Sequence, residues 1–211
     1  MRYPADELYA VLCIESHRHR TEVVGEDLGT VPAEVREGMA EHAIRRMWVV
    51  PFELNVEQAE LSEPPANSVA SLVTHDLPPF KGFLEGRDLR TRPAAERDAR
   101  AEWSAALGAA LGVGEAPAET LLPAALERLA ASSARLVLLG LEDLWLETEP
   151  HNQPGTPSTE NWTLKARHPV DGLEELAEVD RLVQTVDRGR RTARPAPART
   201  KRRRNERSPA S

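Results

Sequence analysis

Residues 21–29 read Thr-Glu-Val-Val-Gly-Glu-Asp-Leu-Gly, and residues 68–76 read Ser-Val-Ala-Ser-Leu-Val-Thr-His-Asp. Each stretch contains a short apolar run and ends in acidic residues, Glu26 and Asp27 in the first and Asp76 in the second. Short apolar runs of this kind predict buried strands. Carboxylates that follow buried strands are typical of sugar-processing barrel enzymes, because strand-end loops build the active site of a parallel barrel.

Two further apolar runs, at 47–51 and 135–141, predict strands that join those at 22–25 and 68–74. Helical spacing of apolar residues predicts helices over 6–16, 33–43, 93–111 and 118–132. Short strands alternating with helices indicate parallel pairing. The sequence therefore predicts an α/β fold. Four strands amount to half of a (β/α)₈ barrel, since a complete barrel takes about 250 residues and the chain has 211. A small open α/β sheet is the alternative.

Charge is distributed unevenly along the chain. The formal net charge is −7, but residues 188–211 contain ten Arg or Lys and one Glu, so this tail carries +9 and the remainder −16. An acidic body repels nucleic acid, which argues against nucleic acid as a partner. The tail is rich in Arg, Pro and Ala, and we expect it to be disordered. Residues 1–187 are then expected to form the partial catalytic domain.

The remaining bulk features concern location and metals. A single cysteine, Cys13, excludes an internal disulfide and suits a reducing compartment. The start of the sequence has no signal-peptide pattern, and the apolar run at 136–141 is too short to span a bilayer. We therefore expect a cytoplasmic protein with no membrane partner. The His-Arg-His run at 17–19 lacks the accompanying ligands of a metal site.

Glu26 and Asp76 have two interpretations. A retaining glycosidase or transglycosylase needs one carboxyl as acid/base and a carboxylate nucleophile on the other side of the sugar. Alternatively, Glu26 and Asp27 cap the helix that follows them, and Asp76 closes a turn. Spacing alone favours the second interpretation, because acidic residues are common at strand ends.

Longer blocks of sequence change this balance. They are Val-Val-Gly-Glu-Asp-Leu-Gly-Thr-Val-Pro at 23–32, Pro-Phe-Glu at 51–53, Ser-Val-Ala-Ser-Leu-Val-Thr-His-Asp-Leu-Pro-Pro at 68–79, Leu-Glu-Asp-Leu at 141–144, Pro-Gly-Thr at 154–156 and Asn-Trp at 161–162. In content and order they resemble the 4-α-glucanotransferases, the amylomaltases or disproportionating enzymes of glycoside hydrolase family 77. The resemblance extends from about residue 3 to about residue 176 and rests on several blocks rather than on a single motif.

The resemblance implies transfer of α-1,4-glucan segments between maltooligosaccharides, or to glucose, by a retaining double displacement. It implies that Glu26 is the general acid/base. It implies that Asp76 is a further carboxylate, which binds sugar hydroxyls and stabilises the transition state. The substrate-binding residues that it implies are His75, Asp27, Asn152 and Gly155. No cofactor and no metal are implied.

One part of the family pattern has no match. The family's nucleophile is an aspartate in an Arg-Ile-Asp-His type segment, on the strand before Gly-Glu-Asp-Leu-Gly, and no such segment occurs here. The sequence thus resembles the C-terminal half of the barrel, its last four strands. Without a nucleophile no glycosyl-enzyme can form, so we expect the isolated chain to be inactive and to need the missing N-terminal half. The alternative is a non-catalytic remnant or glucan-contacting fragment of such an enzyme.

Overall fold

The computed structural model describes residues 3–155 and 161–193 of the chain. At its centre is a parallel sheet in the order β1 (Arg46–Val49), β4 (Ser68–Ser71) and β5 (Leu136–Leu138). A single parallel bridge between Val24 and Arg45 adds a fourth segment beside β1. The predicted parallel pairing is confirmed. The run at 22–25 forms this one bridge in place of a full strand.

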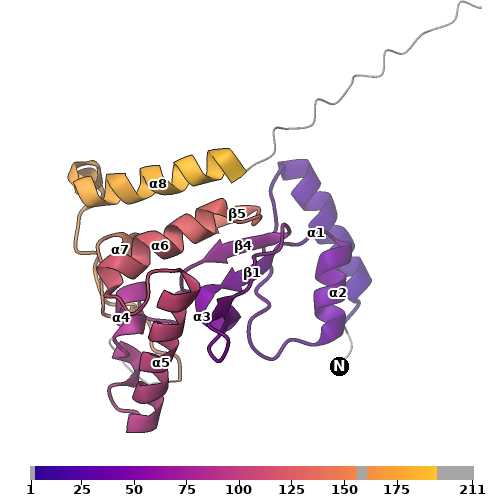
Figure 1. The fold of residues 1–211 in the computed structure, drawn as a ribbon. Coiled ribbons are helices and arrows are strands. Elements are labelled where there is room, and N and C mark those ends of the chain that lie inside the picture. The colour runs from indigo at the N-terminus through magenta and orange to yellow at the C-terminus, as the bar shows by residue number, and fades with distance from the viewer. Residues whose placement is uncertain (1–2, 156–160, 194–211) are drawn as a thin grey trace, which may run out of the picture.

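Helices lie on several sides of the sheet (Figure 1). They are α1 (Ala5–His19), α2 (Ala33–Glu41), α3 (Val50–Glu53), α4 (Phe80–Leu84), α5 (Ala94–Ala110), α6 (Ala118–Ala131), α7 (Leu141–Leu144) and α8 (Ala177–Ala193), with 3₁₀ turns at Arg87–Leu89 and Val170–Glu175. Two short strands, β2 (Leu54–Asn55) and β3 (Glu60–Leu61), form an antiparallel hairpin. Within the described residues, no helix is long and apolar enough to cross a bilayer.

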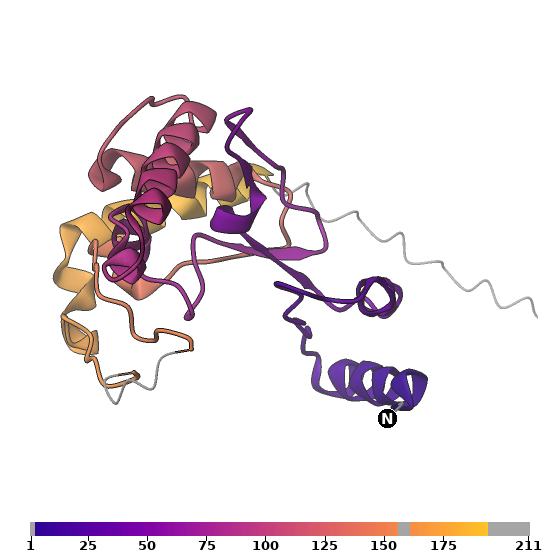
Figure 2. The same cartoon turned by 90° about the horizontal axis from the view of Figure 1, so that it is seen from below.

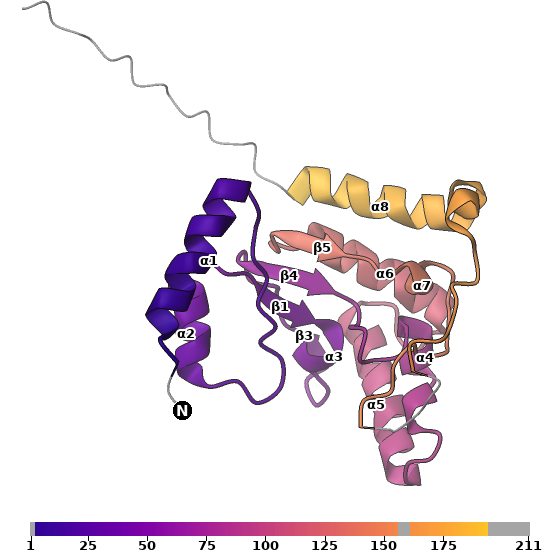
Figure 3. The ribbon, with the colours of Figure 1, turned by 180° about the vertical axis from the view of Figure 1, so that it is seen from behind.

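One face of the sheet packs against the main core. Side chains alternate between the two faces of a strand, and Trp48, Ala70 and Val137 share one face by register. Trp48 and Ala70 belong to a buried cluster with residues of α4, α5, α6 and α8, and Val137 packs against it. α8 lies along α6, while α1 and α2 stand to one side of the sheet, away from α5, α6 and α8 (Figures 2 and 3).

The opposite face becomes open toward β5. Val49 and Val69 are buried on this face, but Leu136 and Leu138 of β5 are 41% and 55% exposed. Val24, at the other edge of the sheet, is also exposed. The sheet therefore presents an apolar surface that nothing in the described part of the chain covers completely.

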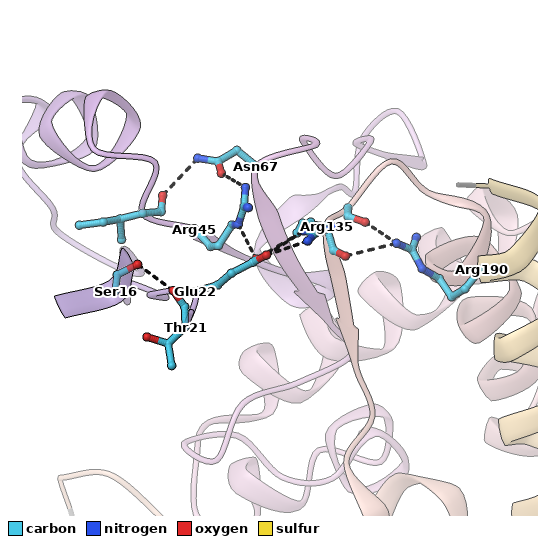
Figure 4. Close-up of polar contacts among 9 residues, drawn as sticks. Ser16, Thr21, Glu22, Arg45, Asn67, Arg135 and Arg190 are labelled. Atoms are coloured by element: carbon cyan, nitrogen blue, oxygen red, sulfur yellow. Dashed lines mark hydrogen bonds and ion pairs between the residues drawn. The ribbon is translucent and has the colours of Figure 1, made fainter. Parts of the chain in front are cut away.

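The amino-terminal ends of the four parallel segments are joined by polar contacts (Figure 4). Glu22 accepts hydrogen bonds from Arg45, at 3.0 Å, and from Arg135, at 2.7 Å. Arg45 also donates to Asn67, which in turn donates to the backbone oxygen of Ile44 at 3.1 Å. The hydrogen bond from Arg135, followed by that from Arg45, lowers the pKa of Glu22. One carboxylate thus connects residues that precede β1 and β5.

The predicted start of the disordered tail at residue 188 is wrong. α8 continues to Ala193, because apolar residues hold it against α6 and its last turns contact the end of that helix. Arg190 donates to the backbone oxygens of Ser132 and Ala134 at 2.9 and 2.6 Å. Gly189 lies so close to α6 that an added Cβ would be 2.6 Å from the Cβ of Ala130. Composition alone did not reveal these contacts. Residues 194–211 lie outside the described residues.

Ending the chain at residue 187 should therefore destabilise it relative to a chain that ends at residue 193. Loss of the Arg190 guanidinium removes charge-assisted hydrogen bonds to carbonyls at the end of α6, for which we expect about 2 kcal/mol. Urea unfolding of both chains measures the difference. In the longer chain, Arg190→Ala should account for most of the loss and Arg191→Ala, whose partner is Asp187 on the surface, for little. Equal urea midpoints for the chains that end at residues 187 and 193 would show that the last turns of α8 do not stabilise the fold.

Candidate functional site

A cavity of about 520 Å³ lies at the carboxyl ends of β1, β4 and β5, on the face of the sheet that becomes open. Met47, Ser71 and Leu138 line it from the three strands. Further lining comes from the loops after β4 and β5, and from His151 and Trp162. We call it the strand-end cavity. In parallel α/β proteins this edge is where active sites form, because the loops there differ in sequence while the strands stay packed.

Three of the predicted site residues meet beside this cavity, where His75 lines it and Asp76 and Asn152 contact each other next to His75. Asn152 donates from Nδ2 to Oδ1 of Asp76 at 2.7 Å. The His75 Nε2 lies 3.6 Å from the same oxygen. The His75 ring also faces the indole of Trp162, with 5.9 Å between centroids and 42° between planes. We call His75, Asp76, Asn152 and Trp162 the rim cluster. It combines a carboxylate, an amide and two rings, and all four groups can contact a polyhydroxylated ligand.

Sequence reasoning missed a buried carboxyl in this site. Asp143 lines the strand-end cavity and is only 2% exposed. Its Oδ1 accepts a hydrogen bond from the backbone N–H of Phe80 at 2.6 Å. Burial raises the pKa of Asp143 to about 7, although the Phe80 hydrogen bond opposes the shift. Asp143 lies in the Leu-Glu-Asp-Leu block at 141–144, which pointed to this region, but nothing in the local sequence distinguishes a buried acid from an exposed one.

Asp27, predicted to bind substrate, lies in the interior of the fold. Its side chain is 1% exposed and paired with Arg46. Oδ2 is 2.6 Å from Nε of Arg46, and Oδ1 accepts from the backbone N–H of Met47 at 3.0 Å. Arg36 also donates to the Asp27 backbone oxygen, at 3.3 Å. Through these contacts Asp27 holds the loop after the Val24 bridge against Arg46 and Met47, at the start of β1.

Glu26 and Gly155 lie apart from the rim cluster. Glu26 is exposed on the loop after the Val24 bridge and does not line the strand-end cavity. No hydrogen bond or ion pair joins it to Asp76 in the part of the chain that the structure describes. Gly155 sits in an exposed turn with a left-handed φ of 77°, which glycine adopts at no steric cost. The structure therefore supports a turn role for Gly155 and does not bring Glu26 and Asp76 into one cavity.

A second polar pair separates the cavity from a smaller hollow. His151 Nε2 lies 3.1 Å from Oε1 of Glu142, and both residues line the cavity on one side and a hollow of about 100 Å³ on the other. Trp145 and Leu164 are among the residues around that hollow. The described residues contain no group of three His, Cys, Asp or Glu side chains that could hold a metal ion. The polar side chains of the site contact one another through hydrogen bonds, and His75 and Trp162 through their rings.

The fold and the site together define an α/β protein of the class whose functional groups lie at the carboxyl ends of parallel strands. The glycoside hydrolase family 77 profile, described as 4-alpha-glucanotransferase, matches residues 1–170. The chain belongs to this family.

Relatives support the same conclusion. The 4-alpha-glucanotransferases of Mycobacterium tuberculosis and Mycobacterium bovis are 30% identical over 223 residues, covering 93% of this chain and 31% of each relative. That of Haemophilus influenzae is 44% identical over 90 residues, covering 42% of this chain and 13% of the relative.

Solved structures agree in fold. The amylomaltase from Corynebacterium glutamicum matches with a TM-score of 0.76 and 25% identity, covering 88% of this chain and 31% of that one. The amylomaltase from Streptococcus agalactiae in complex with acarbose matches in fold with a TM-score of 0.62 and 18% identity, covering 89% of this chain and 36% of that one. The chain thus spans about a third of the length of most of these relatives.

The buried Asp143 should make stability depend on pH. Its pKa is about 7 in the folded chain and 3.8 in an ordinary carboxyl, so the folded state binds the extra proton between these values. The free energy of unfolding should therefore fall as pH rises from about 4 to about 7. Asp143→Asn keeps an acceptor for Phe80 and removes the charge. We expect the variant to match the wild type near pH 4 and to exceed it on the order of 2–4 kcal/mol at pH 8.

Urea unfolding at several pH values measures this difference. Asp98→Asn, which changes an exposed carboxyl on α5, is the matched control and should leave the pH slope unchanged. Parallel pH profiles for wild type and Asp143→Asn would show that Asp143 stays ionised in the folded chain.

Proposed function

We propose that this chain is the C-terminal half, the last four strands, of a (β/α)₈-barrel 4-α-glucanotransferase. The complete enzyme would transfer an α-1,4-glucan segment from one maltooligosaccharide to another, or to glucose. The observation that carries the proposal is the rim cluster: the Thr-His-Asp motif of the family and Asn152 meet at the carboxyl ends of a parallel sheet. The amylomaltase solved with acarbose supports an oligosaccharide as the ligand class.

The reaction would proceed in two successive displacements at the anomeric carbon of the donor sugar. In the first, the nucleophile from the N-terminal half attacks the anomeric carbon, the glycosidic C–O bond breaks, and Glu26 protonates the leaving oxygen. In the second, the ionised Glu26 takes the proton of an acceptor 4-hydroxyl, whose oxygen replaces the nucleophile and restores the α configuration. Asp76 and His75 would hold sugar hydroxyls of the donor.

The position of Glu26 sets a requirement for this mechanism. The two reacting carboxyls of a retaining enzyme are about 5–5.5 Å apart, but Glu26 is exposed and away from the strand-end cavity. The missing half would contribute the strand that precedes the Val24 bridge. Pairing there would extend the single bridge into a full strand and direct Glu26 toward the cavity. We place the enzyme in the cytoplasm because its single cysteine suits a reducing compartment.

A non-catalytic role is the second candidate. Two observations favour it: no segment of the sequence matches the nucleophile motif, and Glu26 lies outside the cavity while the rim cluster is assembled. Such a chain would contact glucan through the rim cluster without cleaving it. Binding without transfer distinguishes this role from that of a half-enzyme.

The isolated chain should not disproportionate maltotriose. The reason is the absent nucleophile, without which neither displacement occurs. A second polypeptide that carries the first barrel half with its Arg-Ile-Asp-His segment should restore transfer. Chromatography of glucose and longer oligomers measures it.

In the restored mixture, Glu26→Gln should lower the rate at least a hundredfold, the range for loss of a general acid/base. Glu37→Gln, which alters an exposed carboxyl on α2, should leave the rate unchanged. Transfer by the isolated chain that Glu26→Gln abolishes would overturn the half-enzyme proposal.

The open sheet face should make the free chain associate with itself. Val24, Leu136 and Leu138 are exposed there, and covering a large apolar side chain gains roughly 1.5–3 kcal/mol. Edge strands of an unclosed sheet add backbone groups that can pair with another chain. We expect sedimentation velocity to show dimers or larger species, and Leu138→Ser to shift the distribution toward monomer. Val170→Ser, at a residue exposed in a 3₁₀ turn, is the control. A monomeric wild type would mean that the face stays uncovered in solution.

A further inference from the structure

Arginines gather at the amino-terminal end of the sheet, opposite the strand-end cavity. Arg45 and Arg135, which precede β1 and β5, both donate to the carboxylate of Glu22, at 3.0 and 2.7 Å. Arg190 of α8 donates to the backbone oxygen of Ala134, the residue before Arg135, at 2.6 Å (Figure 4). The carboxyl-terminal end of α8 is therefore held at this same end of the sheet.

Exposed arginines extend the positive charge around this point. Arg20 is exposed at the end of α1, two residues before Glu22. Arg188 and Arg191 are exposed on the last turns of α8, and Arg191 is paired with Asp187 at 2.8 Å. Among the described residues, the carboxylates that pair with these arginines are Glu22 and Asp187, so positive charge is in excess. We call the five arginines around this end of the sheet the basic edge: Arg20, Arg45, Arg135, Arg188 and Arg191.

The sequence continues this charge beyond α8. Residues 188–211 contain nine Arg, one Lys and one Glu, with a formal charge of +9. Because Arg190 holds the end of α8 beside Ala134, the chain after Ala193 starts next to the basic edge. The residues that follow span at most about 60 Å even when fully extended. A partner that contacts the basic edge is therefore within reach of the charges at 194–211.

The acidic body does not cancel this local charge. The remainder of the chain carries −16, which repels nucleic acid when the chain is taken as a whole. At physiological salt, however, exposed charges more than about 8 Å apart are largely screened from one another. A polyanion at the amino-terminal end of the sheet therefore meets mainly the basic edge and the residues after α8.

The type of cation favours phosphate as its partner. Nine of the ten cationic residues at 188–211 are Arg, whose planar guanidinium binds two phosphate oxygens at once. An anionic membrane fits less well, because binding to a bilayer surface depends on buried apolar area as well as on charge. Residues 194–211 contain no aromatic residue and no Leu, Ile, Val or Met. A nucleic acid offers phosphates without requiring such residues.

We propose that the basic edge and the residues after α8 bind the phosphate backbone of a nucleic acid, independently of base sequence. Phosphate contacts position a protein on a nucleic acid, and base contacts supply specificity. The strand binds at the end of the sheet opposite the strand-end cavity, so the cavity stays open to its own ligand. This binding requires neither Glu26 nor glucan, and it does not rest on the proposed function.

Fluorescence anisotropy of a labelled 20-nucleotide oligouridylate, titrated with the full chain, tests the proposal. We expect a Kd of roughly 10⁻⁴–10⁻⁶ M at physiological salt, the range for sequence-independent binding. An RNA of the same length and mixed sequence should bind within about threefold of this value, because no base is read. The logarithm of the binding constant should fall with the logarithm of salt concentration by about 0.7 for each phosphate neutralised.

A chain that ends at residue 193 separates binding from folding. It keeps the Arg190 hydrogen bonds to Ser132 and Ala134, so its melting temperature should match that of the full chain. Its affinity for the oligonucleotide should fall at least about tenfold, because most of the cations at 188–211 are removed.

Substitutions on α8 test the contribution of the folded part. In the full chain, Arg188→Gln combined with Arg191→Gln should weaken binding at least about threefold and make the salt dependence shallower, as expected for lost phosphate contacts. Arg92→Gln combined with Arg97→Gln is the matched control. These two arginines are exposed at the start of α5, well below α8 in Figure 1, and their loss should change neither quantity.

Three results would overturn the proposal. The first is equal affinity of the full chain and the chain that ends at residue 193. The second is an equal loss in the α8 and α5 double variants, which would show a general effect of net charge. The third is binding to vesicles that contain phosphatidylserine without binding to either oligonucleotide, which would make the partner a membrane surface.

Discussion

The arrangement of the sheet depends on the carboxylate of Glu22. It bonds Arg45 and Arg135, which precede the two outer strands β1 and β5, and Arg45 reaches Asn67 just before β4. The amino-terminal end of β4, the middle strand, therefore lies between residues that are joined to one another through Glu22. This network is partly exposed, and each ion pair alone is worth little. Together with the backbone ladders that join β1, β4 and β5, it holds the amino-terminal ends of the strands side by side, and their opposite ends converge on the strand-end cavity.

At the carboxyl edge a different kind of contact holds the site together. Asp143, in the short helix α7 after β5, accepts a hydrogen bond from the backbone N–H of Phe80, the first residue of α4, which follows β4. Gly82 lies so close to Thr148 that an added Cβ would overlap the backbone oxygen of that residue. The loop that carries His75 and Asp76 and the loop that precedes Asn152 are thereby packed into one unit. The rim cluster is assembled by these supports, and its own exposed hydrogen bonds add to them.

The sequence predicted the parts of this structure that depend on local pattern. Apolar runs gave β1, β4 and β5, helical spacing gave α1, α2, α5 and α6, and the family motifs gave His75, Asp76 and Asn152. It could not show which of two adjacent acids faces solvent. Glu26 is exposed and Asp27 is buried against Arg46, 19 residues further along the chain, and only the fold brings that arginine to it. Asp143 was overlooked for the same reason, since its burial is a property of tertiary packing.

The contact between Gly82 and Thr148 limits how such a site can diverge during evolution. Any side chain at position 82 of α4 would overlap the backbone oxygen of Thr148, so the two segments must move apart to accommodate it. A lineage that acquires a new ligand preference through one loop must therefore accept a compensating change in the other. Insertions and deletions in the two loops should occur as matched pairs among related sequences, and libraries that randomise one loop alone should yield mostly misassembled sites.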